Sequence, residues 1–249
     1  MKAVILSAGQ GKRLLPKTSD KPKCLLPLDG RSVLSWQLEV LAANGVDRVT
    51  VVTGYGADLV DEELAGYRRE HPGQQVETLY NCDYATSDNL VSCWQARAEM
   101  VGDFLLINGD TIFEKNALKR LLAGNGRPVT VTISRKDEYD ADDMKVCLEG
   151  ERLVRIGKDL DLQKVDGESI GMILFRDRGG AWFRDSMERA LATEAARRRW
   201  YLSVIDTMAS AGEVWTCSIA GMAWQEIDYP ADLEEADRLV KDCRLGLSL

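Results

Sequence analysis

Histidine is nearly absent from this 249-residue sequence, which contains only His71. A Ser-His-Asp triad or a multi-histidine zinc site would depend on that one residue, and its polar surroundings predict a solvated position at a helix end. The sequence also lacks a C-x-x-C pair, and its six cysteines are scattered, which indicates free thiols in a reducing, cytoplasmic compartment. We therefore expect chemistry that uses carboxylates, lysine, arginine, backbone amides or a metal held by carboxylates.

Net positive charge and long apolar runs are also missing. The chain has 32 basic and 40 acidic side chains, so its formal net charge is −8, and this argues against nonspecific binding of nucleic acid. No apolar run reaches the roughly 20 residues that a membrane span needs. The first residues do not form a convincing signal peptide, so no membrane partner is expected. The remaining composition, 45% hydrophobic and 29% charged, is typical of a soluble globular protein.

Short apolar runs alternate with helical patterns through the first part of the chain. Strands are predicted at residues 2–7, 48–53, 76–80, 104–108 and 129–134. Helices are predicted from 33 to near 44 and at 58–69, 90–100 and 116–123. This alternation predicts an α/β fold, with a Rossmann-like, mostly parallel central sheet and helices on both faces.

The pattern changes after about residue 135. We expect antiparallel strands at 144–148, 153–156 and 169–175, helices at 182–191 and 202–211, and a strand at 214–219. Pro230, in a first-turn position, predicts a last helix through 240. Because no linker or repeat interrupts the chain, one domain over residues 1–249 with a small antiparallel elaboration in its second half is expected.

The loop after the first predicted strand combines glycines with basic side chains. It is neither a P-loop nor a G-x-G-x-x-G loop, because Leu14 stands where the third glycine would be. Glycines directly after a first parallel strand nevertheless let backbone amides approach phosphates. Lys12, Arg13 and Lys23 gather there in an otherwise acidic chain. The loop predicts anion binding, and a tight strand-to-helix connection is the alternative.

Two carboxylates follow predicted strands. Asp110 comes at the carboxyl end of a central strand, where open α/β sheets bind ligands. Asp228 lies in a second strand-to-carboxylate segment at 224–233. Carboxylates that meet phosphate oxygens commonly hold Mg²⁺, although each aspartate could equally be a helix cap or a turn residue. Glu226 is a weaker candidate for this metal.

The pattern G-x-G-x-R-x-x-P-x-T-x-x-x-P-K at residues 9–23 is far more specific, and it resembles the signature loop of the sugar-nucleotidyltransferase superfamily. The resemblance implies a GT-A-like fold in which Arg13 holds the leaving pyrophosphate and Lys23 the phosphate of the attacking substrate. It also implies nucleotide contacts from Ala8, Gly9, Gly11 and Lys12. Asp110 and the late I-D-x-P-x-D-L element with Asp228 match superfamily positions, which implies that they are the Mg²⁺ ligands.

Residues 81–97 resemble a subgroup of that superfamily, the bacterial CTP:phosphocholine cytidylyltransferases and their relatives. Asp88 replaces the first asparagine of the usual pair, while Asn89 and Ser92 remain. The resemblance implies that Asn89 contributes to the pyrimidine-side pocket, and simple helix capping is the alternative. The element at 108–110 reads Asn-Gly-Asp, which is closer to the sugar transferases.

The second half of the chain holds the candidate acceptor contacts. A choline acceptor would need an aromatic cage, for which Trp94, Tyr139, Trp200 and Tyr201 are candidates, with acids between 137 and 143. Packing and a solvated loop are the alternatives. Lys158 and Glu168 resemble the superfamily's lysine and acceptor-binding strand. The acceptor-binding set is therefore Trp94, Lys158, Glu168 and Tyr201. Residues 1–135 form the nucleotide-binding half and residues 136–249 the acceptor-binding half.

These features together predict a Mg²⁺-dependent nucleotidyltransferase. It would transfer CMP from CTP to a small phosphorylated acceptor such as phosphocholine and release pyrophosphate. The attacking phosphate is already anionic, so the reaction needs no general base, in keeping with the lack of histidine. The alternatives are a hexose-1-phosphate nucleotidyltransferase that uses UTP or dTTP, a cytidylyltransferase for a phosphonate or an inositol phosphate, and a non-catalytic binding subunit.

Overall fold

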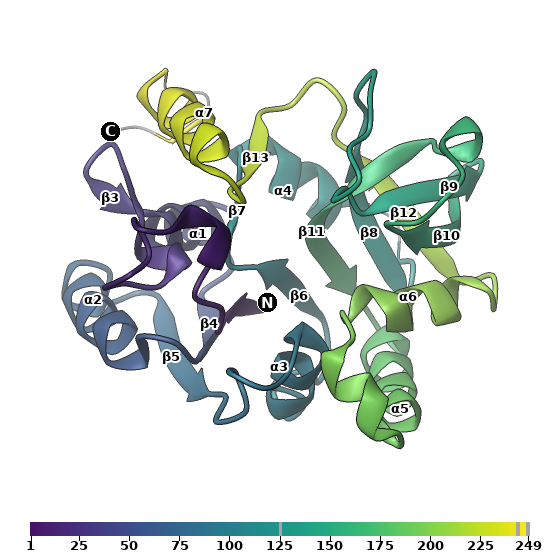
Figure 1. The fold of residues 1–249 in the computed structure, drawn as a ribbon, viewed down its shortest axis with the longest axis horizontal. Coiled ribbons are helices and arrows are strands. Elements are labelled where there is room, and N and C mark those ends of the chain that lie inside the picture. Colours follow the sequence, from purple (N-terminus) through teal and green to yellow (C-terminus); the bar gives the residue numbers. More distant parts are fainter. Residues whose placement is uncertain (125, 243–244, 248–249) are drawn as a thin grey trace. The chain divides into compact units, whose positions relative to one another are not determined.

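The computed structural model describes residues 1–124, 126–242 and 245–247 (Figure 1). Its internal contacts divide the chain into two compact units. Unit 1 comprises Met1–Ala85, Ile107–Lys119 and Met222–Leu249, and unit 2 comprises Thr86–Leu106 and Arg120–Gly221. The units interleave along the chain, since its last segment returns to unit 1 after unit 2 is complete. The expected single domain with halves that meet at residue 135 stays a prediction.

The parallel strands of unit 1 form from runs of branched side chains. β1 (Lys2–Ser7) pairs with β4 (Arg48–Thr53), and β4 pairs with β5 (Gln75–Tyr80), both in parallel (Figure 1). The intervening helices are α1 (Val33–Ala42) and α2 (Ala57–Glu70). Ser32 caps α1, because its hydroxyl oxygen accepts a hydrogen bond from the Ser35 amide at 3.0 Å. The predicted strand–helix alternation is confirmed here.

Unit 1 also contains two short strand pairs; the sequence predicted a strand ahead of Asp228 but neither pairing. One joins β2 (Pro27–Leu28) to β3 (Arg31–Ser32), and the other joins β7 (Thr111–Phe113) to β13 (Trp224–Glu226). Strands of two or three residues are too short to show a periodic pattern. The remaining elements here are η1 (Lys12–Leu14), η2 (Lys23–Leu25), α4 (Lys115–Ala123), which runs into unit 2, and α7 (Pro230–Lys241).

Unit 2 contains a mixed sheet. β8 (Val129–Ser134) pairs in parallel with β12 (Val214–Ser218) and antiparallel with β11 (Gly167–Phe175). β9 (Lys145–Glu149) and β10 (Arg152–Gly157) form the expected antiparallel elaboration. β6 (Phe104–Asn108) begins in unit 2 and ends in unit 1. β8 thus has one parallel and one antiparallel neighbour, in keeping with the predicted mostly parallel sheet and the predicted antiparallel strand at 169–175.

Helices complete unit 2. They are α3 (Asn89–Gln95), α5 (Gly179–Leu191) and α6 (Leu202–Ala209), together with η3 (Leu162–Lys164) and η4 (Glu194–Arg198). α3 ends before the predicted residue 100, because the chain continues there as turns with i to i−3 hydrogen bonds, such as Met100 N to Arg97 O. In the part of the chain that is described, no helix combines the length and the apolar character needed to cross a bilayer.

Gly109 allows β6 to end directly beside β1. Its amide donates to the Leu6 carbonyl at 2.9 Å. A Cβ at this position would lie 2.1 Å from the Ser7 Oγ and 2.6 Å from the Leu6 carbonyl oxygen. Only glycine fits this approach, and the next residue is Asp110.

We expect Gly109→Ala to lower the free energy of unfolding by about 2 kcal/mol or more, because the added methyl group overlaps backbone and forces the strand ends apart. Urea denaturation measures the change. Gly73→Ala is the matched control, since a Cβ there meets nothing within 4 Å. Equal stability of the two variants would contradict the close packing of β6 against β1.

Candidate active site

The loop between β1 and η1 is tied together by Thr18. The Thr18 hydroxyl donates to the Gly11 carbonyl at 2.9 Å, and the Thr18 carbonyl accepts from the Gln10 side chain at 3.2 Å. Gly11 has a φ of 78°, and a Cβ on it would lie 2.9 Å from the Cβ of Lys23. The threonine and the second glycine of the motif therefore bring the loop against Lys23.

The turn after β4 braces the same loop from outside. The Tyr55 amide donates to the Ala8 carbonyl at 3.0 Å, and the Tyr55 hydroxyl donates to the Ser19 carbonyl at 2.6 Å. Gly54 permits this contact, since a Cβ there would lie 2.6 Å from the Ala8 oxygen. The sequence predicted only that the strand at 48–53 ends at this glycine-rich turn. It did not predict the hydrogen bonds from Tyr55 to the loop.

The pairing of β7 with β13 brings Asp110 and Asp228 together. The register places Glu226 opposite Thr111, and the Ile227 amide then donates to the Asp110 carbonyl at 2.9 Å. The next residue is Asp228. Two carboxylates separated by more than one hundred positions in the sequence thus meet because two short strands pair.

The turn that carries Asp228 is fixed by Asp232. One Asp232 carboxylate oxygen accepts hydrogen bonds from the Asp228 amide at 2.9 Å and from the Tyr229 amide at 2.7 Å. An acid in the first turn that accepts the amide of the N-cap residue stabilises the start of a helix, and here it also fixes the backbone of Asp228 and Tyr229 directly before α7. This explains the second aspartate of the I-D-x-P-x-D-L element.

Lys23 joins the two carboxylates. Its Nζ lies 2.8 Å from Asp110 Oδ2 and 2.6 Å from Asp228 Oδ1. Burial lowers the pKa of the Lys23 ammonium, but attraction to the two carboxylates outweighs burial and raises the pKa well above its usual value. Lys23 therefore stays a cation, and one positive charge holds two negative charges in a partly buried site.

Arg13 binds the other oxygen of Asp228. Its Nη2 lies 2.7 Å from Asp228 Oδ2, and its Nη1 donates to the Tyr229 hydroxyl at 3.3 Å. The guanidinium carbon lies 5.0 Å from the centre of the Tyr229 ring. Both cations of the predicted phosphate site are consequently held by the same aspartate.

A cavity of about 290 Å³ opens beside these groups. Of the predicted nucleotide, catalytic and metal residues, the cavity is lined by Gly9, Gly11, Lys12, Arg13, Lys23, Asp110 and Asp228. Ala8 lies next to this set and carries the brace from Tyr55. The buried Cys24 also lines the cavity, and burial raises its pKa to about 12, so the thiol stays protonated and is a poor nucleophile. Cys243 lies outside the described residues.

The carboxylates of Asp110 and Asp228 are suitable ligands for a divalent cation that also binds the phosphates of a substrate. Asp110 Oδ1 is buried and has no hydrogen-bond partner among the described residues, so it offers an acceptor without a donor. In the described part of the chain no group of three or more His, Cys, Asp or Glu side chains is arranged to hold a metal. Mg²⁺ is commonly held by one or two carboxylates plus substrate phosphates, which the Asp110–Asp228 pair fits. Glu226 does not line the cavity.

The predicted contacts Asn89, Trp94 and Tyr201 lie in unit 2. The Asn89 side-chain oxygen accepts from the Tyr201 amide at 2.8 Å, and the Tyr201 ring is fully buried. Arg97 lies over the Trp94 ring, 4.4 Å from its centre. The helix-cap alternative for this segment is also present, since the Asp88 side chain accepts from the Asn89 amide at 2.7 Å.

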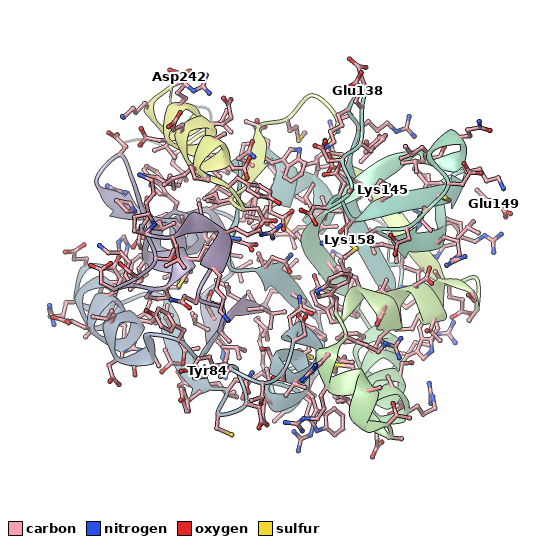
Figure 2. The ribbon with its side chains drawn as sticks, in the orientation of Figure 1. Tyr84, Glu138, Lys145, Glu149, Lys158 and Asp242 are labelled. Atoms are coloured by element: carbon pink, nitrogen blue, oxygen red, sulfur yellow. The ribbon has the colours of Figure 1, made fainter. Side chains whose placement is uncertain are left out.

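Lys158 takes part in a polar cluster of unit 2. Its Nζ lies 3.1 Å from Asp142 and 4.5 Å from the centre of the Trp200 ring. The buried Lys145 donates to the Lys158 carbonyl at 2.9 Å (Figure 2). This cluster gathers Lys145 at the start of β9, Lys158 directly after β10 and Asp142 from the loop before β9.

Glu168 is a buried member of the same sheet. Burial raises the pKa of its carboxyl to about 7, while Lys136, with Nζ 3.2 Å away, acts in the opposite direction. Asp143 also pairs with Lys136, at 2.8 Å. We therefore expect the Glu168 carboxyl to ionise close to neutral pH.

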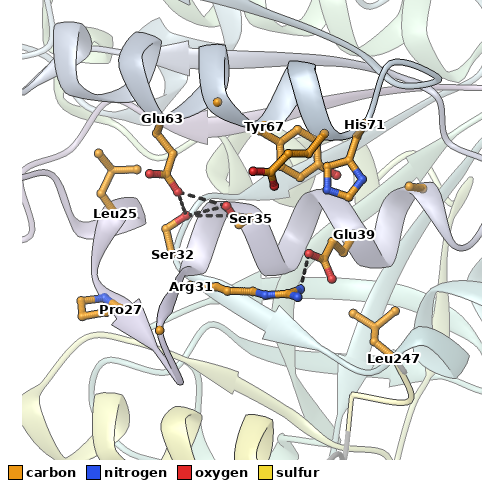
Figure 3. A pocket seen from close by; sticks show the side chains of 14 residues that line it. Leu25, Pro27, Arg31, Ser32, Ser35, Glu39, Glu63, Tyr67, His71 and Leu247 are labelled. Carbon is orange, nitrogen blue, oxygen red and sulfur yellow. Dashed lines mark hydrogen bonds and ion pairs between the residues drawn. The ribbon is translucent and has the colours of Figure 1, made fainter. Parts of the chain in front are cut away.

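His71 lines a second cavity in unit 1, of about 830 Å³ (Figure 3). It ends α2 and stacks on Tyr67 with the ring centres 4.2 Å apart. Glu63 accepts hydrogen bonds from Ser32 and Ser35 across this cavity. The histidine is therefore partly covered rather than simply solvated, and its contacts are those of a packed helix end.

Comparison with known proteins gives a consistent result. A family model described as a MobA-like NTP transferase domain matches residues 3–206. The CMP-5'-(3-aminopropyl)phosphonate synthase of Streptomyces rubellomurinus is 31% identical over 250 residues, which cover 95% of this chain and 38% of that protein. The choline-phosphate cytidylyltransferase of Streptococcus pneumoniae is 29% identical over 137 residues, 55% of each chain. The chain spans 38% to 53% of the length of the first curated relatives it matches.

The fold is shared with a solved structure, the inositol-1-phosphate CTP transferase from T. maritima. The TM-score is 0.82 at 23% sequence identity, and the match covers 100% of this chain and 98% of the other. The predicted resemblance to the sugar-nucleotidyltransferase superfamily and its cytidylyltransferases, and the predicted α/β fold, are confirmed.

We expect Lys23→Met to lower the free energy of unfolding by about 2 kcal/mol, because it removes charged hydrogen bonds and leaves two carboxylates facing each other. Methionine keeps the unbranched stem that packs against Gly11. Urea denaturation measures the change, and Lys17→Met, at an exposed position of the same loop, is the control. Equal stability of the two variants would show that the bridge adds nothing.

The raised pKa of Glu168 predicts a pH effect on stability. The folded chain holds this proton to a higher pH than the unfolded chain, so ionisation of Glu168 lowers the free energy of unfolding as the pH rises from about 4.5 to about 7. Glu168→Gln stays neutral and gains stability relative to the wild type over that interval. Urea denaturation along a pH series measures this, with the exposed Glu62→Gln as control. Parallel profiles of wild type and Glu168→Gln would contradict it.

Proposed function

The chain belongs to the family of MobA-like NTP transferase domains, and from this premise we propose that it is a Mg²⁺-dependent cytidylyltransferase. It transfers CMP from CTP to a small acceptor that carries a phosphate or phosphonate group, and it releases pyrophosphate. The observation that carries the proposal is the Lys23 ammonium between Asp110 and Asp228, at 2.8 and 2.6 Å. Cations and metal-ligand carboxylates there share one small cavity.

The reaction is a substitution at phosphorus. An oxygen of the acceptor's phosphate or phosphonate attacks the α-phosphorus of the triphosphate, the bond from that phosphorus to the bridging oxygen breaks, and pyrophosphate leaves with the bond electrons. The nucleophile is already ionised, so no side chain has to remove a proton. Positioning and charge neutralisation supply the rate enhancement, which agrees with a cavity that His71 does not line.

Asp110 and Asp228 would hold the Mg²⁺. The ion supplies neutralisation of the charge that develops on the phosphate oxygens. Once Arg13 and Lys23 are released from Asp228, Arg13 binds the leaving pyrophosphate and Lys23 binds the phosphate of the attacking acceptor. The backbone amides of Ala8, Gly9 and Gly11, with a methyl group at Ala8 and no side chain at the two glycines, leave room for the nucleotide beside Lys12.

Cytosine is proposed on two grounds. Residues 81–97 resemble the cytidylyltransferases, with Asn89 assigned to the pyrimidine side of the pocket. Two of the proteins whose match covers 95% or more of this chain carry CMP or CTP in their names, namely CMP-5'-(3-aminopropyl)phosphonate synthase and inositol-1-phosphate CTP transferase.

The aromatic side chains of unit 2 disfavour phosphocholine as the acceptor. A quaternary ammonium binds open ring faces, yet Arg97 covers Trp94, Lys158 covers Trp200, and the Tyr201 ring is buried. Within the described part of unit 2, a cation of the chain thus lies over the rings of Trp94, Trp200 and Tyr139, the last 5.9 Å below Lys136 Nζ, and Trp200 is 40% exposed. Lys158 and Glu168 remain the proposed acceptor contacts, Lys158 for the phosphate or phosphonate group and Glu168 for hydroxyls or an ammonium group.

Pyrophosphate release tests the proposal. Each of the four common nucleoside triphosphates is combined with phosphocholine, an aminoalkylphosphonate, inositol 1-phosphate or glucose 1-phosphate, with Mg²⁺ or with a chelator. We expect release with CTP and the phosphonate or the inositol phosphate, and none with the chelator. Release with glucose 1-phosphate and UTP or dTTP would establish a hexose-1-phosphate enzyme. No release from any pair would overturn the proposal.

Asp110→Asn is expected to lower kcat at least about 100-fold, the size of effect seen when one electrostatic group of an active site is removed. The thermal melting curve should show a folded protein. Asp58→Asn, at an exposed position in the first turn of α2, is the control and should keep wild-type turnover. Full activity of Asp110→Asn would exclude this carboxylate as a metal ligand.

A further inference from the structure

Tyr229 touches Arg13 in two ways that need no negative charge. The guanidinium lies over the ring with 5.0 Å between its carbon and the ring centre, and its Nη1 donates to the phenol oxygen at 3.3 Å. Tyr229 is 45% exposed, so its ring supports the arginine without filling the core. Its backbone is fixed separately, by the Asp232 carboxylate that accepts its amide at 2.7 Å.

Asp228 is the second group that holds Arg13. Under the proposed function, this contact is lost when Asp228 binds the metal. Each of its oxygens is occupied by a cation, Oδ2 by Arg13 and Oδ1 by Lys23. A divalent cation that takes Asp228 competes with both contacts. It does not compete for the ring face or for the phenol oxygen of Tyr229, because these are weak, neutral partners beside a carboxylate.

We propose that Tyr229 is a positioning residue for Arg13. It keeps the guanidinium beside the nucleotide loop when Asp228 turns to the metal, and it thereby presents Arg13 to the pyrophosphate group. A guanidinium stacked on a ring keeps most of its N–H groups, which project from its edge, for phosphate oxygens. The inference rests on the proposed function, since it takes Asp228 as a metal ligand and Arg13 as the pyrophosphate contact.

The affinity for inorganic pyrophosphate is a direct measure, and it does not depend on which base or acceptor the enzyme uses. With Mg²⁺ present, we expect Tyr229→Leu to raise the Kd of pyrophosphate about fivefold to tenfold, as expected for the loss of one exposed cation–π contact and one hydrogen bond. Tyr229→Phe keeps the ring and loses the hydroxyl, so its Kd should rise only about twofold to threefold.

The same pyrophosphate titration with a chelator distinguishes a positioning role of Tyr229 from a purely structural one. Without the metal, Asp228 still holds Arg13, so wild type and Tyr229→Leu should differ by less than about twofold. A purely structural role would instead lower the melting temperature and weaken binding equally in both conditions. Since Asp232 fixes the backbone at Tyr229, we expect the melting temperature of the variant to stay at the wild-type value.

A double-mutant cycle with Arg13→Gln tests whether Tyr229 affects pyrophosphate binding through Arg13. If Tyr229 acts through Arg13, then adding Tyr229→Leu to Arg13→Gln changes the Kd by less than about twofold. Trp215→Leu is the matched control, because it removes a ring that lies under another arginine, Arg127, at 4.1 Å. That variant should bind pyrophosphate as the wild type does.

The outcomes separate this inference from the proposed function. If the wild type binds pyrophosphate with Mg²⁺ and Tyr229→Leu binds it equally well, the positioning role is wrong while the proposed function stands. The role is also wrong if Tyr229→Leu raises the Kd of pyrophosphate as much on the Arg13→Gln background as it does in the wild type. If the wild type binds no pyrophosphate and releases none from any substrate pair, the proposed function fails, and the inference fails with it.

Discussion

The site in unit 1 depends on one ion bridge, the Lys23 ammonium between Asp110 and Asp228. The bridge joins segments that are 87 and 205 residues apart in the chain. Like charges that face each other in a partly buried place are destabilising unless a cation lies between them. The close approach at Gly109, the left-handed Gly11 and the amides clamped by Asp232 all serve to bring these three charges to hydrogen-bonding distance.

The net charge of −8 is compatible with a polyanionic substrate because the charges of the pocket are paired before the substrate arrives. Arg13 and Lys23 neutralise Asp228 in the structure. On the proposed mechanism, Asp110 and Asp228 would hold the Mg²⁺, and Arg13 and Lys23 would bind the phosphate groups. Each charge then exchanges one partner for another, so the pocket never exposes an uncompensated cluster to a low-dielectric surrounding.

The sequence predicted the elements that show a periodicity or a dense motif. The strand at Lys2–Ser7, the Ser32 cap and the loop at residues 9–23 all have such local signals. It could not predict that β7 pairs with β13, because three-residue strands carry no pattern, and this pairing is what brings Asp228 to Asp110. The contact of Arg13 with Tyr229, 216 positions apart, likewise leaves no trace in a single sequence. For Tyr201 the sequence left packing and acceptor binding open, since an aromatic residue before a helix suits either, and the structure buries the ring.

The return of the chain to unit 1 at residue 222 has a consequence for synthesis. The ribosome produces Arg13, Lys23 and Asp110 early and Asp228 only after the whole of unit 2 has been synthesised. Domains fold largely as units during translation, so unit 2 can fold while unit 1 still lacks β13 and α7. Until then, the Lys23 side chain has only Asp110 as an acidic partner from this trio. The cavity beside Lys23 is thus complete only once Asp228 has been synthesised and has paired with Arg13 and Lys23.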